Sequence, residues 1–364
     1  MNSITLLQKL VAIDSTSSLS NLPMVELLER EVRALGFETR RLSWTDAAGL
    51  AKANLIAQRG PPGGLSLVGH TDCVPYDPAW TLALAGEERD GRLYGRGAAD
   101  TKGFIAAALG AASRSSRPLT LVFTADEEVG CLGARRLVEE GAVRPAFAIV
   151  GEPTRMTPVL GHKGYCLAEI TVTGAEGHSA YPETGASAIF AAGRLLRELE
   201  QVGAALQEQA DPLFAPPWTT LNVGLIAGGK AKNVIPGSCT LTLEWRPLPS
   251  QDPRRALALV EAACGRVSGG GIRVEVRTSR LDAGVAVPRS SAVLQFLEGE
   301  TGRAAETIPF GTELPYLAAL GADACVFGPG DIRVAHRTGE FIPLAELARA
   351  EEILARAIDR FAPR

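Results

Sequence analysis

The chain has 364 residues, of which 46% are hydrophobic and 21% are charged, and this predicts a globular protein of two domains or one large domain. Its formal net charge of −4, with no basic run or basic-aromatic patch, argues against binding to nucleic acid. No apolar run approaches the ~18 residues that a membrane span needs, so we expect no membrane partner.

The cysteines and the N-terminal residues indicate the compartment. The six cysteines are widely spaced and form no CxxC pair, which is typical of small buried thiols in a reducing compartment. Residues 1–14 carry apolar side chains at helical spacing, which predicts an amphipathic helix and not a signal peptide. We therefore expect a cytoplasmic protein.

Up to about residue 160, short apolar strands alternate with helices. Gly36 is well placed to end the second helix, because glycine adopts the left-handed conformation common after helix ends. The repeated order of strand, charged tip and helix predicts a layered α/β domain with a mostly parallel sheet. The predicted helices span residues 3–13, 22–35, 101–112 and 132–139, and the predicted strands span 37–42, 54–58, 65–68, 119–124 and 147–150.

The pattern changes after Gly161, where residues 165–173 alternate as a half-buried strand does. Strands at 165–173, 219–226, 239–245 and 272–278 with helices at 186–200 and 253–264 give the order βαββαβ, which matches a ferredoxin-like α+β unit. Helices at 290–301, 313–320 and 344–361 and a strand at 324–327 then resume the first pattern. We predict a catalytic domain of residues 1–160 and 280–364 with a domain of residues 161–279 inserted in it.

Ionisable residues gather at the ends of the predicted strands, where α/β sheets place their chemistry. Such a set of carboxylates with no lysine among them would repel one another, and divalent cations would relieve that repulsion. Two imidazoles, one bridging carboxylate and two terminal carboxylates suit a pair of Zn²⁺ ions, or Co²⁺ or Mn²⁺, and leave one of Glu127 and Glu128 free to act as a base. The residues are His70, Asp72, Asp100, Glu127, Glu128, Glu152 and His336.

Other chemistries have little support. Taken alone, a histidine or a loop aspartate is more often a core residue or a cap than a ligand. The segment from Gly95 to Asp100 lacks the third glycine of a dinucleotide-binding fingerprint. The sequence has no GxSxG elbow and no P-loop, and Ser179 beside His178 is not the geometry of a catalytic triad.

Five motifs in order along nearly the whole chain resemble the M20 metallopeptidase/deacylase family. They are Gly69-His70-Thr71-Asp72-Cys73-Val74-Pro75, Gly95-Arg96-Gly97-Ala98-Ala99-Asp100-Thr101-Lys102-Gly103, Thr124-Ala125-Asp126-Glu127-Glu128-Val129-Gly130, Gly151-Glu152-Pro153-Thr154 and Gly177-His178-Ser179. The resemblance implies one metal ion held by His70 and Glu152, another held by Glu128 and His336, and Asp100 bridging them. It also implies Glu127 as the general base, Asp72 as the partner of His70, and a peptide of unusual geometry at Asp100-Thr101.

The same resemblance implies that the inserted domain is a lid that also forms a homodimer contact. His178 would polarise the scissile carbonyl in its own or the partner's active site, although without the family a solvent-facing histidine is the plainer interpretation. Arg246 could hold an α-carboxylate in bidentate fashion, and Asn233 could donate to the same substrate. Glu313 could face a substrate cation, or could cap the helix that follows it.

The implied reaction is hydrolysis of the amide between a small acyl group and an amino acid with a free α-carboxylate. The favoured substrate is N2-acetyl-L-ornithine, giving L-ornithine and acetate for arginine biosynthesis. N-succinyl-diaminopimelate and N-acetylcitrulline remain open as substrates, as do dipeptides or other peptides. A metal-dependent binding protein without catalysis is a further alternative, which a missing base or ligand would favour.

Overall fold

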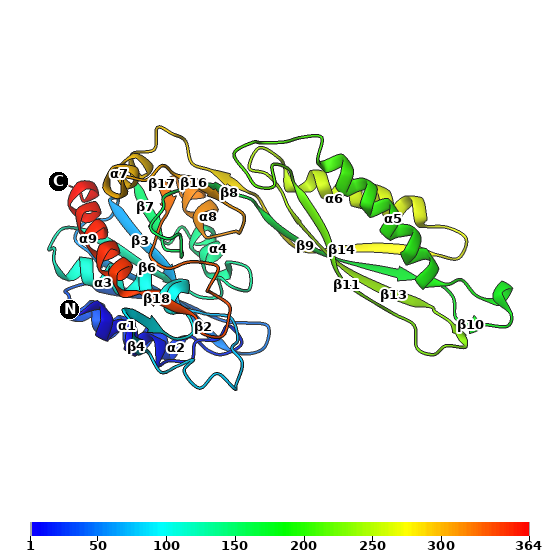
Figure 1. Ribbon diagram of the computed structural model, residues 1–364, viewed down its shortest axis with the longest axis horizontal. Coiled ribbons are helices and arrows are strands. Elements are labelled where there is room, and N and C mark those ends of the chain that lie inside the picture. Colours follow the sequence, from blue (N-terminus) through cyan, green and yellow to red (C-terminus); the bar gives the residue numbers. More distant parts are fainter. Residues whose placement is uncertain (1, 364) are drawn as a thin grey trace. The chain divides into compact units, whose positions relative to one another are not determined.

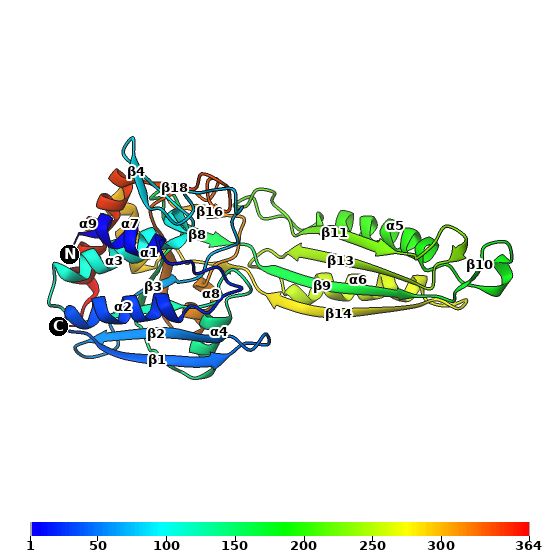
Figure 2. The same ribbon diagram turned by 90° about the horizontal axis from the view of Figure 1, so that it is seen from below.

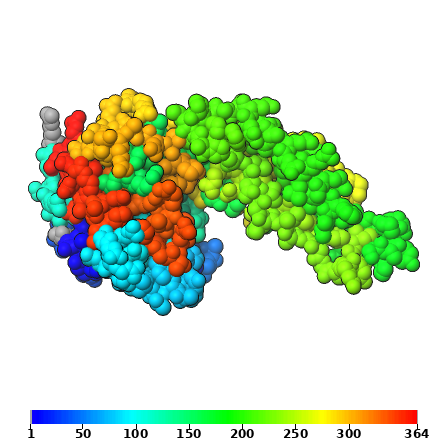
Figure 3. All heavy atoms as spheres, in the orientation of Figure 1, coloured from blue at the N-terminus to red at the C-terminus, as the bar shows by residue number. Residues whose placement is uncertain are grey.

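The computed structural model describes residues 2–363, and the chain forms two compact units. The first unit comprises Met1–Leu160, Val287–Glu306 and Thr312–Arg364, and the second comprises Gly161–Ala286 and Thr307–Gly311. Figure 3 shows both ends of the sequence, blue to cyan and orange to red, in the first unit, whereas most of the second is green. The second unit therefore interrupts the first and continues beyond residue 279 to Ala286.

A nine-stranded sheet forms the centre of the first unit and runs in the order β1-β2-β6-β3-β7-β17-β8-β15, with β16 beside β8 (Figure 1). The inner strands β6, β3, β7 and β17 are parallel, whereas β1, β2, β8 and β15 pair antiparallel at the two sides. The expected layered α/β fold with a largely parallel central sheet is thus confirmed. The strands are β1 (Glu38–Thr45), β2 (Ala51–Arg59), β3 (Leu65–His70), β6 (Leu119–Thr124), β7 (Phe147–Val150), β8 (Val159–His162), β15 (Val285–Ala286), β16 (Glu306–Ile308) and β17 (Asp323–Val326).

The inner strands form because their apolar runs can be covered on both faces. Every residue of β3 and β6 is buried, as is usual for strands at the centre of a parallel sheet. Helix α3 (Gly103–Ser113) packs on both strands and is almost all alanine, glycine and other apolar residues. A side chain at Gly110 would collide with Ser3 and Glu351, so its absence lets α3 approach α1 and α9 closely (Figure 2). The other helices of this unit are α1 (Ser3–Val11), α2 (Leu22–Ala34), α4 (Leu132–Glu139), α7 (Ala292–Thr301), α8 (Leu314–Ala319) and α9 (Leu344–Phe361).

The second unit has a four-stranded antiparallel sheet in the order β11-β13-β9-β14. Burial alternates strictly along β13 and closely along β9, because one face of the sheet packs on α5 and α6 around Leu195, Leu243 and Trp245. With the chain order β9-α5-β11-β13-α6-β14, this sheet order is that of a ferredoxin-like unit. The elements are β9 (Tyr165–Thr173), α5 (Ala188–Leu206), β11 (Thr220–Gly228), β13 (Ser238–Arg246), α6 (Pro253–Val267) and β14 (Arg273–Asp282).

Several elements of two to five residues were not predicted, because such short stretches carry no detectable period. A small sheet of the first unit, β18-β5-β4, pairs Phe341 with Tyr94 and so holds the loop before residue 341 beside the segment that leads to Asp100. In the second unit, β10 and β12 pair as a two-stranded ribbon. These strands are β4 (Glu87–Arg89), β5 (Arg92–Tyr94), β10 (Gly177–His178), β12 (Val234–Ile235) and β18 (Phe341–Pro343), and two short helical turns span Ala98–Lys102 and Pro182–Thr184.

The cysteines agree with the sequence-based expectation, since all six are free and buried. Among residues 2–363, no helix combines the length and the apolar character that crossing a membrane requires.

Candidate metal centre

The parallel strands end at one edge of the sheet, and candidate ligands follow these ends. His70 is the last residue of β3, Glu128 lies in the turn after β6, and Glu152 lies two residues after β7. The chain after β17 leads to His336. Because parallel strands present their carboxyl ends together, side chains far apart in sequence converge here. The ligand atoms of three of them lie within 4.8 Å of one another: those of His70, Asp100 and Glu128.

Asp100 lies between the two histidines. Its Oδ1 is 3.0 Å from Nε2 of His70, and its Oδ2 is 3.1 Å from Nε2 of His336. With one oxygen facing each imidazole, the carboxylate has the arrangement that a ligand bridging two ions needs. The peptide bond from Asp100 to Thr101 is cis, which is the unusual geometry that the family resemblance implied.

His336 is held in a left-handed conformation, with φ of 60°. Its Nε2 also lies 3.1 Å from Oε1 of Glu128, so this imidazole contacts both Glu128 and Asp100. Its side chain is 47% exposed, whereas that of His70 is only 1% exposed. One histidine of the centre is therefore enclosed, and the other forms its accessible side.

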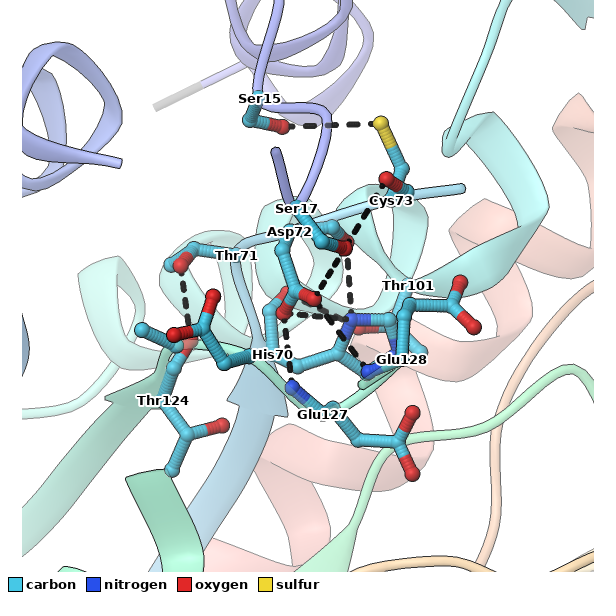
Figure 4. A network of polar contacts seen from close by, with 12 residues as sticks. Ser15, Ser17, His70, Thr71, Asp72, Cys73, Thr101, Thr124, Glu127 and Glu128 are labelled. Atoms are coloured by element: carbon cyan, nitrogen blue, oxygen red, sulfur yellow. Dashed lines mark hydrogen bonds and ion pairs between the residues drawn. The ribbon is translucent and has the colours of Figure 1, made fainter. Parts of the chain in front are cut away.

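Glu127 and Glu128 lie in a turn whose backbone is held by Asp72 (Figure 4). The N–H groups of Glu127 and Glu128 donate to Oδ1 and Oδ2 of Asp72, at 3.0 and 3.3 Å. Ser17 Oγ donates to the same Oδ2 at 2.8 Å. The two glutamate side chains have different partners, because Glu128 meets His336 while Oε1 of Glu127 accepts from Cys131 Sγ at 3.3 Å. The two carboxylates therefore have different partners, His336 for Glu128 and Cys131 for Glu127.

Asp72 orients His70 mainly through its backbone. The Nδ1 atom of His70 lies 2.9 Å from the carbonyl oxygen of Asp72, but 3.7 Å from its carboxylate. A hydrogen bond from Nδ1–H to a carbonyl leaves Nε2 free to bind a metal ion. The Asp72 carboxylate, which the resemblance assigned to His70, makes its shorter contacts with Ser17 and with the Glu127–Glu128 turn.

The electrostatics of the cluster reflect a shortage of positive charge. Burial raises the pKa of Glu127 to about 8 against the opposing charge of His70, and burial together with the Asp100 charge raises the pKa of Glu128. Burial and the Asp100 charge raise the pKa of Glu152 well above its usual value. Hydrogen bonds to Asp100 and Glu128 raise the pKa of His336 to about 10. Raised pKa values are expected where several buried carboxylates lie close together, and divalent cations would offset the repulsion among them.

The donor set fits divalent metal ions that accept both nitrogen and oxygen. Imidazole nitrogen and carboxylate oxygen are ligands typical of Zn²⁺, Co²⁺ and Mn²⁺ sites. Glu152 is buried and near enough to Asp100 for that charge to raise its pKa, and its role as a terminal ligand stays a prediction. The five expected ligands, His70, Asp100, Glu128, Glu152 and His336, all belong to the first unit.

Glu313 also belongs to the first unit and is only 1% exposed. Among residues 2–363, neither of its carboxylate oxygens has a hydrogen-bond partner, and it makes no capping hydrogen bond to α8. Burial raises the pKa of Glu313 to about 7, against the opposing effects of the His70 charge and of the nearby Thr124 hydroxyl. Glu313 occupies the N-cap position of α8 without a side-chain capping bond, and its role as a cap or as a substrate contact stays a prediction.

The remaining candidates lie in the second unit. His178 is exposed on the β10–β12 ribbon, where its Nδ1 accepts from the N–H of Ala180 at 3.1 Å. Asn233 is exposed just before β12, and its backbone carbonyl accepts a hydrogen bond from the N–H of Ser179 at 3.1 Å. Arg246 ends β13 with its guanidinium 4.6 Å from the ring centroid of Tyr165. Their roles toward a substrate remain predictions.

One supporting pair escaped the sequence analysis. Glu340 accepts the N–H groups of Ala99 and Asp100 with Oε1, at 3.1 and 3.3 Å, and its Oε2 lies 2.6 Å from Nη1 of Arg96. Both charged side chains are buried. The sequence shows both as charged residues next to glycine or apolar residues, which could have marked them as buried. Their pairing could not be predicted, because the two lie 244 positions apart and one sequence does not reveal such a contact.

Comparison with known proteins gives the same picture over the whole chain. The family model described as Peptidase family M20/M25/M40 matches residues 66–360. An acetylornithine deacetylase from Myxococcus xanthus is 52% identical over 365 residues, which cover 98% of this chain and 96% of that protein. An acetylornithine deacetylase from Photorhabdus laumondii is 35% identical, over 98% of this chain and 97% of its own.

Solved structures share the fold at lower identity. An M20 family metallo-carboxypeptidase from Sulfolobus solfataricus matches with a TM-score of 0.78 and 17% identity, over 98% of this chain and 99% of its own. A dinuclear metal-binding peptidase of the M20 family from Bacillus subtilis matches with a TM-score of 0.70 and 16% identity, over 98% and 96% of the two chains.

Proposed function

The chain belongs to peptidase family M20/M25/M40, and we propose that it is a two-metal deacetylase that converts N2-acetyl-L-ornithine into L-ornithine and acetate. The observation that carries this proposal is the 52% identity to an acetylornithine deacetylase along nearly the full length of both proteins. The presence of all five expected ligands and of the expected base supports catalysis over metal-dependent binding alone.

His70 and Glu152 would hold one ion, Glu128 and His336 would hold the other, and Asp100 would bridge them. The position of Asp100 between the two imidazoles supports this division. When bound, Zn²⁺, Co²⁺ or Mn²⁺ ions would polarise the scissile carbonyl and acidify a water molecule.

Glu127 would move the proton. It would take a proton from the attacking water and give it to the leaving nitrogen of ornithine, while the acyl carbon gains the water oxygen and leaves as acetate. Its carboxylate is enclosed and burial raises its pKa, which is typical of a group that accepts and releases a proton. The side chain of Glu127 contacts Cys131, whereas that of Glu128 contacts His336, and this difference supports different roles for the two glutamates.

Residues of both units would read the substrate. Arg246 would pair with the α-carboxylate, Asn233 would donate to it, and His178 would polarise the scissile carbonyl. Glu313 would receive the side-chain ammonium of ornithine, which would give its buried carboxylate a partner of opposite charge.

We also propose that the second unit acts as a lid and forms a homodimer contact. The edge strand β11 exposes Leu225 and Ile226, and the first turn of α5 exposes Phe190, which is 76% accessible. Apolar side chains beside an unpaired strand edge favour contact with a second copy.

We further propose a cytoplasmic location, because the six buried free thiols fit the reducing conditions of that compartment.

A substrate panel tests the proposal against its alternatives. The protein, supplied with Zn²⁺ or Co²⁺, would be assayed with N2-acetyl-L-ornithine, N-acetylcitrulline, N-succinyl-diaminopimelate and a set of dipeptides. We expect kcat/KM for acetylornithine to exceed that for acetylcitrulline, whose side chain is neutral, by more than a factor of ~10, or about 1.4 kcal/mol.

Comparable kcat/KM values for acetylornithine and acetylcitrulline would mean that the protein does not recognise the charge of the substrate side chain. Preferred cleavage of the succinylated substrate or of dipeptides would replace the deacetylase proposal with one of those activities. Binding of metal without turnover of any substrate would support the non-catalytic alternative.

A further inference from the structure

A buried lysine joins two segments of the first unit beside the metal centre. Lys52 lies on β2 with its side chain 1% exposed, and its Nζ is 2.6 Å from Oδ1 of Asp126 and 2.7 Å from the carbonyl oxygen of Ser17. Asp126 is 2% exposed. Burying both charges costs about as much free energy as their attraction returns, so such a pair adds little stability compared with apolar residues. The residues that this pair contacts are therefore more informative about its role than the stability that it adds.

Both contacts lead to the residues proposed for chemistry. Asp126 directly precedes Glu127 and Glu128, and its φ of 57° starts the turn that carries them. Ser17, whose carbonyl Lys52 contacts, donates its hydroxyl to Asp72. Asp72 in turn accepts the N–H groups of Glu127 and Glu128. The contacts form a closed ring, from Lys52 through Asp126, the glutamate turn, Asp72 and Ser17 back to Lys52.

We propose that Lys52 is a positioning residue of the metal centre, whose ammonium group fixes the Glu127–Glu128 turn against Asp72. The inference rests on the proposed roles of Glu127 as base and Glu128 as ligand. A displacement of about 1 Å in a catalytic group can cost on the order of 100-fold in rate. Because the turn carries a base and a ligand, its loosening lowers both the rate and the affinity for metal. Substrate binding depends mainly on other residues and changes little.

The test compares the wild type with Lys52→Met and Lys52→Arg. Lys52→Met should lower kcat at least ~10-fold at saturating metal and raise the dissociation constant of the weaker zinc ion at least ~10-fold. KM should change less than threefold. Lys52→Arg, which keeps the charge, should recover part of both losses. Unchanged kcat and zinc affinity in Lys52→Met would overturn the proposal.

The double variant Lys52→Met/Asp126→Asn separates positioning from charge burial. It leaves no unpaired charge in the interior, and asparagine tolerates the left-handed backbone of residue 126. We expect its unfolding temperature to return toward that of the wild type while kcat and zinc affinity stay low. Recovery of both kcat and zinc affinity would mean that the lysine only neutralises Asp126, and would overturn the proposal.

A milder pair of variants decides the question if the lysine variants do not fold. Ser17→Ala breaks the ring at a half-buried hydroxyl, whereas Ser20→Ala removes a hydroxyl of the same loop that contacts the Ala51 carbonyl and not Asp72. Ser17→Ala should lower kcat several-fold and Ser20→Ala should not, and equal values in the two would overturn the proposal. Zinc titration needs no substrate, so it tests the ring even if the protein does not hydrolyse acetylornithine.

Discussion

At the level of single side chains, two carboxylates at or beside the centre, those of Asp100 and Glu340, have different partners at their two oxygens. Asp100 divides its oxygens between His70 and His336, and Glu340 divides its own between Arg96 and the backbone before and at Asp100. Rotating any such carboxylate would break a contact on one side, so its orientation is set before an ion or substrate arrives. Preorganised groups of this kind lower the cost of reaching a reactive geometry.

Arg246 provides a prediction about substrate recognition. Arg246→Ala should raise KM for acetylornithine about 30-fold, or ~2 kcal/mol, the lower end of what a paired charge contributes when desolvated. The methyl ester of the substrate should be poor for the wild type and should change little with the mutation. Steady-state kinetics with acid and ester measure both effects.

Arg280→Ala is the matched control for Arg246. The guanidinium groups of Arg280 and Arg246 both lie 4.6 Å from the ring centroid of Tyr165, and each has a carboxylate partner, Asp282 at 2.5 Å for Arg280 and Glu244 at 3.5 Å for Arg246. Removal of Arg280 should leave KM within about twofold. An equal rise in KM in both variants, or equal sensitivity of acid and ester, would show that Arg246 does not read the carboxylate.

At the level of helices and strands, the position of the site follows from the parallel sheet. The fully buried β3 and β6 could be predicted because continuous apolar runs bounded by polar tips are typical of inner parallel strands. The ligands at those tips, such as His70 and Glu128, could be predicted with them. The left-handed conformation of His336 and the ring through Lys52 could not, because long-range contacts leave no periodic pattern in one sequence.

His162 on β8 gives a prediction about pH and stability. Its Nδ1 contacts the Lys163 carbonyl at 2.8 Å, and burial lowers its pKa from 6.5 to about 4. As pH falls from 6.5 toward 4, the unfolded chain binds a proton at this site that the folded chain does not, so stability is lost across that window. This group alone should cost about 2 kcal/mol between pH 7.5 and pH 5.

His162→Asn removes the titration and can keep a donor near the Nδ1 position. The metal-free variant should lose about 2 kcal/mol less unfolding free energy than the metal-free wild type between pH 7.5 and pH 5, as measured by denaturant unfolding. An equal loss in the two proteins would mean that His162 is not held neutral by burial.

At the level of the whole chain, the two units carry different parts of the proposed reaction. The first unit holds the five candidate ligands, the candidate base and Glu313, and the second holds His178, Asn233 and Arg246. On the proposed assignments, the ions and the proton are handled at the sheet edge of the first unit, and most of the residues that would recognise the substrate belong to the second unit. Variants of the candidate ligands and base should change metal content or kcat, whereas variants of Glu313, Arg246 and Asn233 should act on KM.

The adjacent glutamates test this account most directly, through metal content measured by elemental analysis beside kcat. Glu127→Gln should keep near-normal metal content and lose at least ~100-fold in kcat, the lower end of what a positioned base contributes. Glu128→Gln should bind metal more weakly, and excess metal should restore part of its activity. Loss of metal in Glu127→Gln with retention in Glu128→Gln would mean that the two roles are exchanged. A Glu127→Gln protein that keeps both its metal and its rate would contradict the assignment of Glu127 as the base.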